Sequence, residues 1–286
     1  MKSIKIKDKN KLVAYLYFYL NYDPKIKERA DFVTDLVKDM RESRVVGFAG
    51  FAKKEGLKKD LLEMLFSPGN VKTISKPKFN KKEILKISKK TIKRCHEEIL
   101  SKPTRIFIFP ALDSFTKNKL SGVKGFCRWQ YSILINIFPN NKTKEWKKVL
   151  KRLICHEYNH SVVAKATQKE PIKWNMLEAI IYEGFSTNFE EYICKKPGPY
   201  AKALSKKDCE KYFLKIKKHF NLKGKNQFKL YKALFYEGKK YPLWAGYSIG
   251  YQVVKDFLEK NPKLKWQEII KTNPKKVLKE SSFGKL

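Results

Sequence analysis

Residues 154–163 read ICHEYNHSVV and hold two of the four histidines in the 286-residue chain. His156 and His160 are four residues apart, and Glu157 directly follows the first of them. Residues i and i+4 share one face of an α-helix, so both imidazoles can reach one zinc ion. Zinc lowers the pKa of a bound water, and Glu157 is placed to accept the proton that this water loses. The stretch therefore predicts a zinc site with a general base.

The competing interpretation of this stretch is a pair of buried structural histidines without a metal. A chance HExxH match in so lysine-rich a chain would be expected to contain charged residues inside the motif. Tyr158, Asn159 and Ser161 are uncharged, and Val162 is apolar. These flanking residues favour the metal site.

A catalytic zinc site needs a third protein ligand and an open position. Residues 171–194 are expected to form the next helix, and they offer Glu178 and Glu183 as candidates. We favour Glu183 because its neighbours are apolar, and an unpaired carboxylate in apolar surroundings would be costly. Gly184 beside it would let another backbone approach closely.

Strand and helix patterns around the motif predict an α+β fold. Residues 104–111 and 131–138 are rich in β-branched and aromatic residues, as is typical of strands. A helix is expected from Glu145 through the histidines, with Thr143 as its N-cap. Residues 131–138 are expected to form an exposed edge strand, and an extended peptide would pair with such an edge.

The expected organisation is a mainly helical region over residues 1–100 and a catalytic domain over residues 101–286. A single continuous domain would also accommodate the pattern. The apolar run at residues 12–20 is too short to span a bilayer, and no cleavage site of a signal peptide follows it. The five cysteines are widely spaced and form no CxxC pair, which favours reduced thiols and a cytoplasmic protein.

The formal charge of +36 comes from 64 Lys and Arg against 28 Asp and Glu. Such a charge attracts polyanions, and weak, non-specific polyanion binding is expected. Lysines are spread through all the expected helices, however, so a solvated basic surface explains the charge equally well. The charge alone does not indicate a dedicated nucleic-acid function.

The motif and its surroundings resemble a known family. HEYNH followed by YEGFSTNFEE resembles the gluzincin zinc peptidases, and more specifically the YjaZ-like predicted Zn-dependent proteases. Further matching segments are IFIFP at residues 106–110, GVKGF at 122–126 and AGYSIGYQVV at 245–254. The resemblance covers residues 103–286.

The resemblance implies a zincin-like fold, mostly helical, with a small antiparallel or mixed sheet packed beside the HExxH helix. It implies one Zn²⁺ per chain and a peptide or protein substrate. In this interpretation His156, His160 and Glu183 bind zinc, and Glu157 is the general base.

Three further residues take roles only through the resemblance. Glu190 would orient a ligand histidine, although it would equally fit a solvated acidic pair with Glu191. Tyr247 or Tyr251 would stabilise the oxyanion, and we favour Tyr247.

Other classes of function remain open from the sequence. A non-catalytic zinc-stabilised module would complete the coordination of the metal with a fourth protein ligand. A nucleic-acid-associated zinc protease would resemble the SprT-like type, but such proteins use a third histidine and often a CxxC ribbon, which this sequence lacks.

Overall fold

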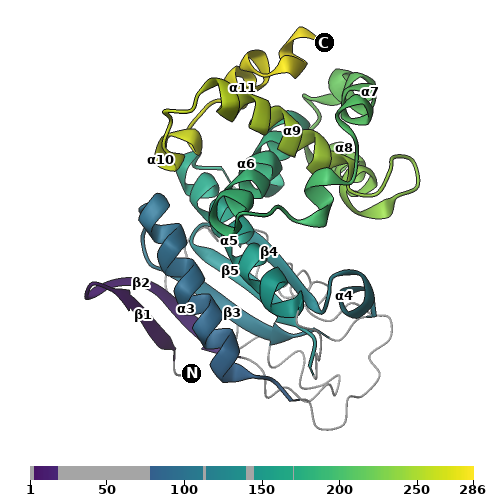
Figure 1. Ribbon diagram of the computed structural model, residues 1–286. Coiled ribbons are helices and arrows are strands. Elements are labelled where there is room, and N and C mark those ends of the chain that lie inside the picture. Colours follow the sequence, from purple (N-terminus) through teal and green to yellow (C-terminus); the bar gives the residue numbers. More distant parts are fainter. Residues whose placement is uncertain (1–2, 19–77, 112–113, 140–144, 170) are drawn as a thin grey trace. The chain divides into compact units, whose positions relative to one another are not determined.

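The structure is a computed structural model of the 286-residue chain (Figure 1). It describes residues 3–18, 78–111, 114–139, 145–169 and 171–286. The described elements are a five-stranded mixed sheet and a larger set of helices, which confirms the expected α+β class. None of the helices in this described part is both long and apolar enough to cross a bilayer.

The chain divides into two compact units. The first comprises residues 1–93 and 101–154, and the second comprises residues 94–100 and 155–286. Helices α3 (Lys81–Glu98) and α5 (Glu145–Ala166) each contribute residues to both units. All the strands belong to the first unit, and the motif histidines belong to the second.

The sheet of the first unit has the strand order β1-β2-β3-β5-β4. Its strands are β1 (Ile4–Asp8), β2 (Lys11–Phe18), β3 (Thr104–Pro110), β4 (Val123–Trp129) and β5 (Ser132–Ile137). The pairs β1–β2 and β4–β5 are antiparallel, whereas β3 is parallel to both β2 and β5. A short helix, α4 (Ser114–Lys119), precedes β4.

Strand β5 corrects one expectation from the sequence. It is paired on both sides, with β3 and with β4, and all six of its residues are buried. Its consecutive apolar residues 133–135, without alternation, are typical of such a central strand. The outer strands of the described sheet are β1 and β4, so the expectation that residues 131–138 form an edge is wrong.

The beginning of the chain contains two strands that were not expected from the sequence. Residues 4–18 form a β-hairpin and residues 81–98 form α3, and the expectation that residues 1–100 are mainly helical stays a prediction. Lys9 and Asn10 connect the strands with φ values of 41° and 67°, as a two-residue type I′ turn requires. Most of the remaining segment, residues 19–77, lies outside the described residues, and so does the expected N-cap Thr143.

The second unit is helical. After the last part of α5 come α6 (Met176–Cys194), α7 (Lys206–Ile216), α8 (Gly224–Lys232), α9 (Ala245–Lys260), α10 (Trp266–Ile269) and α11 (Pro274–Glu280). Single turns lie between or after them: η2 (Pro171–Lys173), η3 (Pro199–Lys202), η4 (Lys217–His219), η5 (Ala233–Glu237) and η6 (Ser282–Lys285). Helix α6 is buried over most of its length and contacts α8, α9 and α11, so it is the core helix of this unit.

Helices α6 and α9 touch backbone to backbone at two glycines. A Cβ atom added to Gly184 would lie 2.2 Å from the carbonyl oxygen of Gly250, and one added to Gly250 would lie 2.3 Å from the carbonyl oxygen of Ile180. Both distances are far shorter than van der Waals contact, so a side chain at either position would push the helices apart. The close approach expected at Gly184 is confirmed. It brings α9, with Tyr247, against the helix that carries Glu183.

Candidate metal centre

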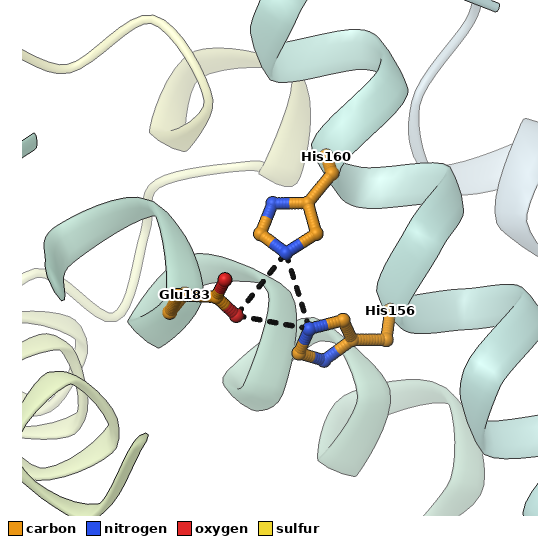
Figure 2. Close-up of side chains that lie close together, drawn as sticks. All are labelled: His156, His160 and Glu183. Atoms are coloured by element: carbon orange, nitrogen blue, oxygen red, sulfur yellow. Dashed lines mark hydrogen bonds and ion pairs between the residues drawn. The ribbon is translucent and has the colours of Figure 1, made fainter. Parts of the chain in front are cut away.

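Three side chains converge inside the second unit. His156 and His160 project from one face of α5, and Glu183 reaches them from α6 (Figure 2). The two Nε2 atoms are 3.1 Å apart, and Glu183 Oε2 lies 3.1 Å from the first and 3.2 Å from the second. Each residue is only 4–5% exposed. The three atoms form a nearly equilateral triangle shielded from solvent.

This triangle fits a tetrahedral metal ion. Ligand atoms about 2.0 Å from a tetrahedral centre are about 3.3 Å apart. Two imidazole nitrogens that face each other need a proton or a cation between them, because two lone pairs would repel. Two histidines and one glutamate are a known ligand set of zinc sites that keep an open position. Within the part of the chain that the structure describes, no other His, Cys, Asp or Glu side chain completes the cluster.

The charges around the triangle favour a cation. Burial lowers the pKa of His156, but hydrogen bonds with Glu183 and Glu190 outweigh burial and raise this pKa to about 10. Burial likewise raises the pKa of Glu183, but the two histidines reverse this effect and hold the pKa well below the usual carboxyl value. Glu183 is therefore an ionised ligand at neutral pH.

Glu157 follows His156 on α5 and does not belong to the triangle. It is 6% exposed. Burial raises the pKa of its carboxyl group, the two histidines lower it, and the charges of Glu183 and Glu190 raise it again, with a net upward shift. This carboxylate is thus close enough to interact with the ligands electrostatically while remaining available to accept a proton.

Glu190 lies behind His156, on the side away from the triangle. Its Oε2 atom is 3.5 Å from His156 Nδ1, and the Tyr200 hydroxyl donates a hydrogen bond to the same oxygen. Glu190 is fully buried, so it is not the solvated member of an acidic pair. The structure places it where a residue that orients His156 would lie.

Ser186 takes the corresponding place behind His160. Its hydroxyl oxygen lies 3.1 Å from His160 Nδ1 and donates to Asn159 Oδ1 at 3.1 Å. Because the Ser186 hydroxyl donates its proton to Asn159, its oxygen can accept a hydrogen bond from His160 Nδ1–H. With the proton on Nδ1, the lone pair of His160 Nε2 faces the triangle. This residue was not expected from the sequence, because no local signal distinguishes Ser186 from other buried helix serines.

A second missed residue is Tyr231 of α8. Its hydroxyl donates to Glu183 Oε1 at 2.6 Å and so occupies the carboxylate oxygen that does not face the histidines. Burial raises the pKa of this hydroxyl well above its usual value, so it remains a donor at neutral pH. Tyr231 therefore fixes the orientation of the Glu183 carboxylate.

A π turn, η5, follows α8 and carries Tyr236. Tyr231 and Tyr236 are five residues apart and would point in different directions on a regular α-helix. The wider π turn brings them together, with ring centroids 5.8 Å apart. The Tyr236 hydroxyl lies 3.3 Å from the Tyr247 hydroxyl, so this turn connects α8 to the tyrosine on α9.

The two candidate tyrosines of α9 lie in different places. The Tyr247 ring centroid is 6.2 Å from that of His156, and burial raises the pKa of its hydroxyl well above the usual value. Tyr251 instead donates to Glu191 Oε2 at 2.7 Å. Of the two tyrosines, the structure brings Tyr247 to the site and holds Tyr251 at another carboxylate.

Glu178, the other candidate ligand, has a different task. Asn175 is the N-cap of α6: its side chain accepts from the Glu178 backbone N–H, while the Glu178 carboxylate accepts from the Asn175 backbone N–H. The same carboxylate pairs with Lys169. The Glu178 carboxylate thus stabilises the N-terminus of α6. The helix begins at Met176, after a separate turn at Pro171–Lys173.

A family model described as Predicted Zn-dependent protease (DUF2268) matches residues 84–279. This segment contains every residue of the site described above. Neither a curated protein nor a solved structure matches the chain.

Proposed function

Because the chain belongs to the family of predicted Zn-dependent proteases, we propose that it is a zinc peptidase that hydrolyses peptide bonds with a water activated by Glu157. The observation that carries the proposal is the buried triangle of His156, His160 and Glu183, with ligand atoms 3.1–3.2 Å apart. One Zn²⁺ per chain would be held by these three residues. A peptide or a protein is the substrate class.

Bound zinc would supply a Lewis acid that polarises the substrate carbonyl and makes water more acidic. Glu157 would accept the proton of the attacking water and pass it to the leaving amine. Tyr247 would donate a hydrogen bond to the carbonyl oxygen as negative charge develops on it. Both side chains lie next to the triangle without belonging to it.

The remaining residues would keep the ligands in place. Glu190 holds the outer nitrogen of His156, Ser186 holds that of His160, and Tyr231 holds the outer oxygen of Glu183. Each ligand thus has one partner outside the triangle. Such partners fix the ring or carboxylate orientation and increase metal affinity.

Zinc content tests the proposal first. Purified wild-type protein, dialysed against metal-free buffer, should contain one zinc per chain by elemental analysis, and Glu183→Ala should contain at least about tenfold less. Glu178→Ala is the matched control, because it removes a carboxylate of the same helix that serves the cap and the ion pair with Lys169. Folded wild-type protein that takes up no zinc would refute the proposal.

A non-catalytic zinc module is the alternative that this experiment leaves open. In that case the wild-type protein would bind zinc as tightly. It would cleave no member of a peptide library, even when it is folded and loaded with zinc. The open position of the triangle, as far as the described residues extend, favours the peptidase. The polyanion binding expected from the charge stays a prediction.

Ser186→Ala should weaken zinc binding by about 10–100-fold, because His160 Nδ1 loses the acceptor that orients its ring. Competition with a chelator of known affinity measures the change. Ser161→Ala is the control, since Ser161 is equally buried on α5 but donates to the carbonyl oxygen of Tyr158. Ser186→Thr keeps the hydroxyl and should restore most of the affinity. Equal affinities of the two alanine variants would contradict this role.

A further inference from the structure

Two cysteines meet where the ligand-bearing helices of the second unit lie against each other. Cys155 Sγ on α5 is 3.8 Å from Cys194 Sγ at the end of α6. Cys155 directly precedes His156, and α6 carries Glu183. None of the five cysteines, all of which the structure describes, is in a disulfide. The proposed peptidase chemistry uses neither thiol.

We propose that Cys155 and Cys194 form a modification site at which a low-molecular-weight disulfide, such as oxidised glutathione, closes a reversible intramolecular disulfide between α5 and α6. The two sulfur atoms are already in van der Waals contact. Rotation of the side chains has to shorten their separation to the disulfide bond length of about 2.05 Å. The bond would join α5, which carries the two histidines of the metal triangle, to α6, which carries Glu183.

Accessibility decides which thiol reacts first. Cys155 is fully buried, whereas Cys194 is partly exposed in the last turn of α6. Lys195 and Lys196 follow it and are exposed, so two positive charges lie next to this thiol in sequence. Exposed cations attract an anionic disulfide such as oxidised glutathione. The oxidant therefore enters at Cys194.

The reaction then proceeds by two thiol–disulfide exchanges. The Cys194 thiolate attacks one sulfur of oxidised glutathione, which forms a mixed disulfide and releases one glutathione thiolate. Cys155 then attacks Cys194 Sγ, which forms the Cys155–Cys194 bond, and the departing glutathione sulfur takes up the Cys155 proton. Two protein thiols are oxidised, and one glutathione disulfide is reduced to two thiols.

Cys95 is the competing partner. It also lies within hydrogen-bonding range of Cys155, but it is fully buried. A bond between Cys95 and Cys155 would require the oxidant to reach one of two sulfur atoms that are both enclosed in the protein. The partial exposure of Cys194 makes the Cys155–Cys194 bond the expected product.

The test uses the folded full-length protein treated with oxidised glutathione, blocked with N-ethylmaleimide and digested without reductant. Mass spectrometry should find a peptide in which Cys155 is linked to Cys194, and the thiol count should fall by two per chain and recover with dithiothreitol. Wild-type protein that keeps all five thiols, links Cys155 to Cys95 or stops at glutathione on Cys194 would overturn the proposal. The readout needs neither zinc nor hydrolysis.

Variants sharpen the assignment. Cys194→Ser should abolish both the cross-link and the loss of thiols, whereas Cys155→Ser should stop at the mixed disulfide on Cys194. Cys209→Ser is the control, because Cys209 lies on α7 and should leave the cross-link unchanged. If a variant does not fold, the peptide map of the wild type alone decides.

Discussion

Glu157→Gln should retain zinc but hydrolyse peptides about 10²–10⁴ times more slowly than the wild type. The amide has nearly the shape of the carboxylate but cannot accept the proton of the attacking water. Glu157 is not part of the ligand triangle, so the metal should remain bound. The measurement is kcat on a peptide that the wild type cleaves, with zinc content determined on the same preparation.

Glu191→Gln is the matched control for this experiment. Glu191 is a carboxylate of α6 that accepts from Tyr251 and contacts no ligand of the triangle. Its variant should keep kcat within about twofold of the wild type. If Glu157→Gln were as active as Glu191→Gln, Glu157 would not be the general base.

Tyr247→Phe should lower kcat by about 10²–10³-fold with little change in KM. The hydroxyl is expected to donate to the carbonyl oxygen only as charge develops there, so its loss affects the transition state more than substrate binding. Burial keeps the hydroxyl protonated through the neutral range, so the defect should be the same from pH 6 to pH 8.

Two other tyrosines separate this role from a structural one. Tyr251→Phe removes a hydroxyl that is held by Glu191 and should leave kcat within about twofold once folding is verified. Tyr236→Phe removes the hydroxyl that lies 3.3 Å from that of Tyr247 and should have an intermediate effect. If all three variants had the same kcat, Tyr247 would have no special role.

The centre of the site could be predicted because its signals are local. The spacing of His156 and His160 puts them on one helix face, and the two imidazoles do converge. Glu183 was favoured because a carboxylate in apolar surroundings needs a partner, and it has the histidines. In both cases the signal comes from residues that are close neighbours in the sequence.

The outer partners could not be predicted, because they depend on contacts between distant segments. Tyr231 reaches Glu183 across 48 residues of sequence, and a π turn, which has no clear sequence signature, brings Tyr236 beside it. The N-terminal hairpin was missed for a related reason. Strand β2 obtains its parallel neighbour β3 from a segment more than 80 residues later, and the continuous apolar run at residues 12–18 does not reveal this.

Two features of the structure had usable signals in the sequence. Asn175 followed by Glu178 has the spacing of a capping box, which assigns Glu178 to the helix N-terminus rather than to a metal. The consecutive apolar residues 133–135, without alternation, are typical of a central strand rather than an edge. In both places the pattern had a specific structural meaning that a count of apolar or acidic residues does not capture.

The π turn at Ala233–Glu237 gives this part of the chain one residue more than regular α-helical winding needs. Deleting one residue there would place Tyr236 four residues after Tyr231, on the same face of a regular α-helix. Tyr236 would then stay beside Tyr231, and Tyr231 would still contact Glu183. Relatives that lack one residue at this turn should therefore share both the metal ligands and this pair of tyrosines.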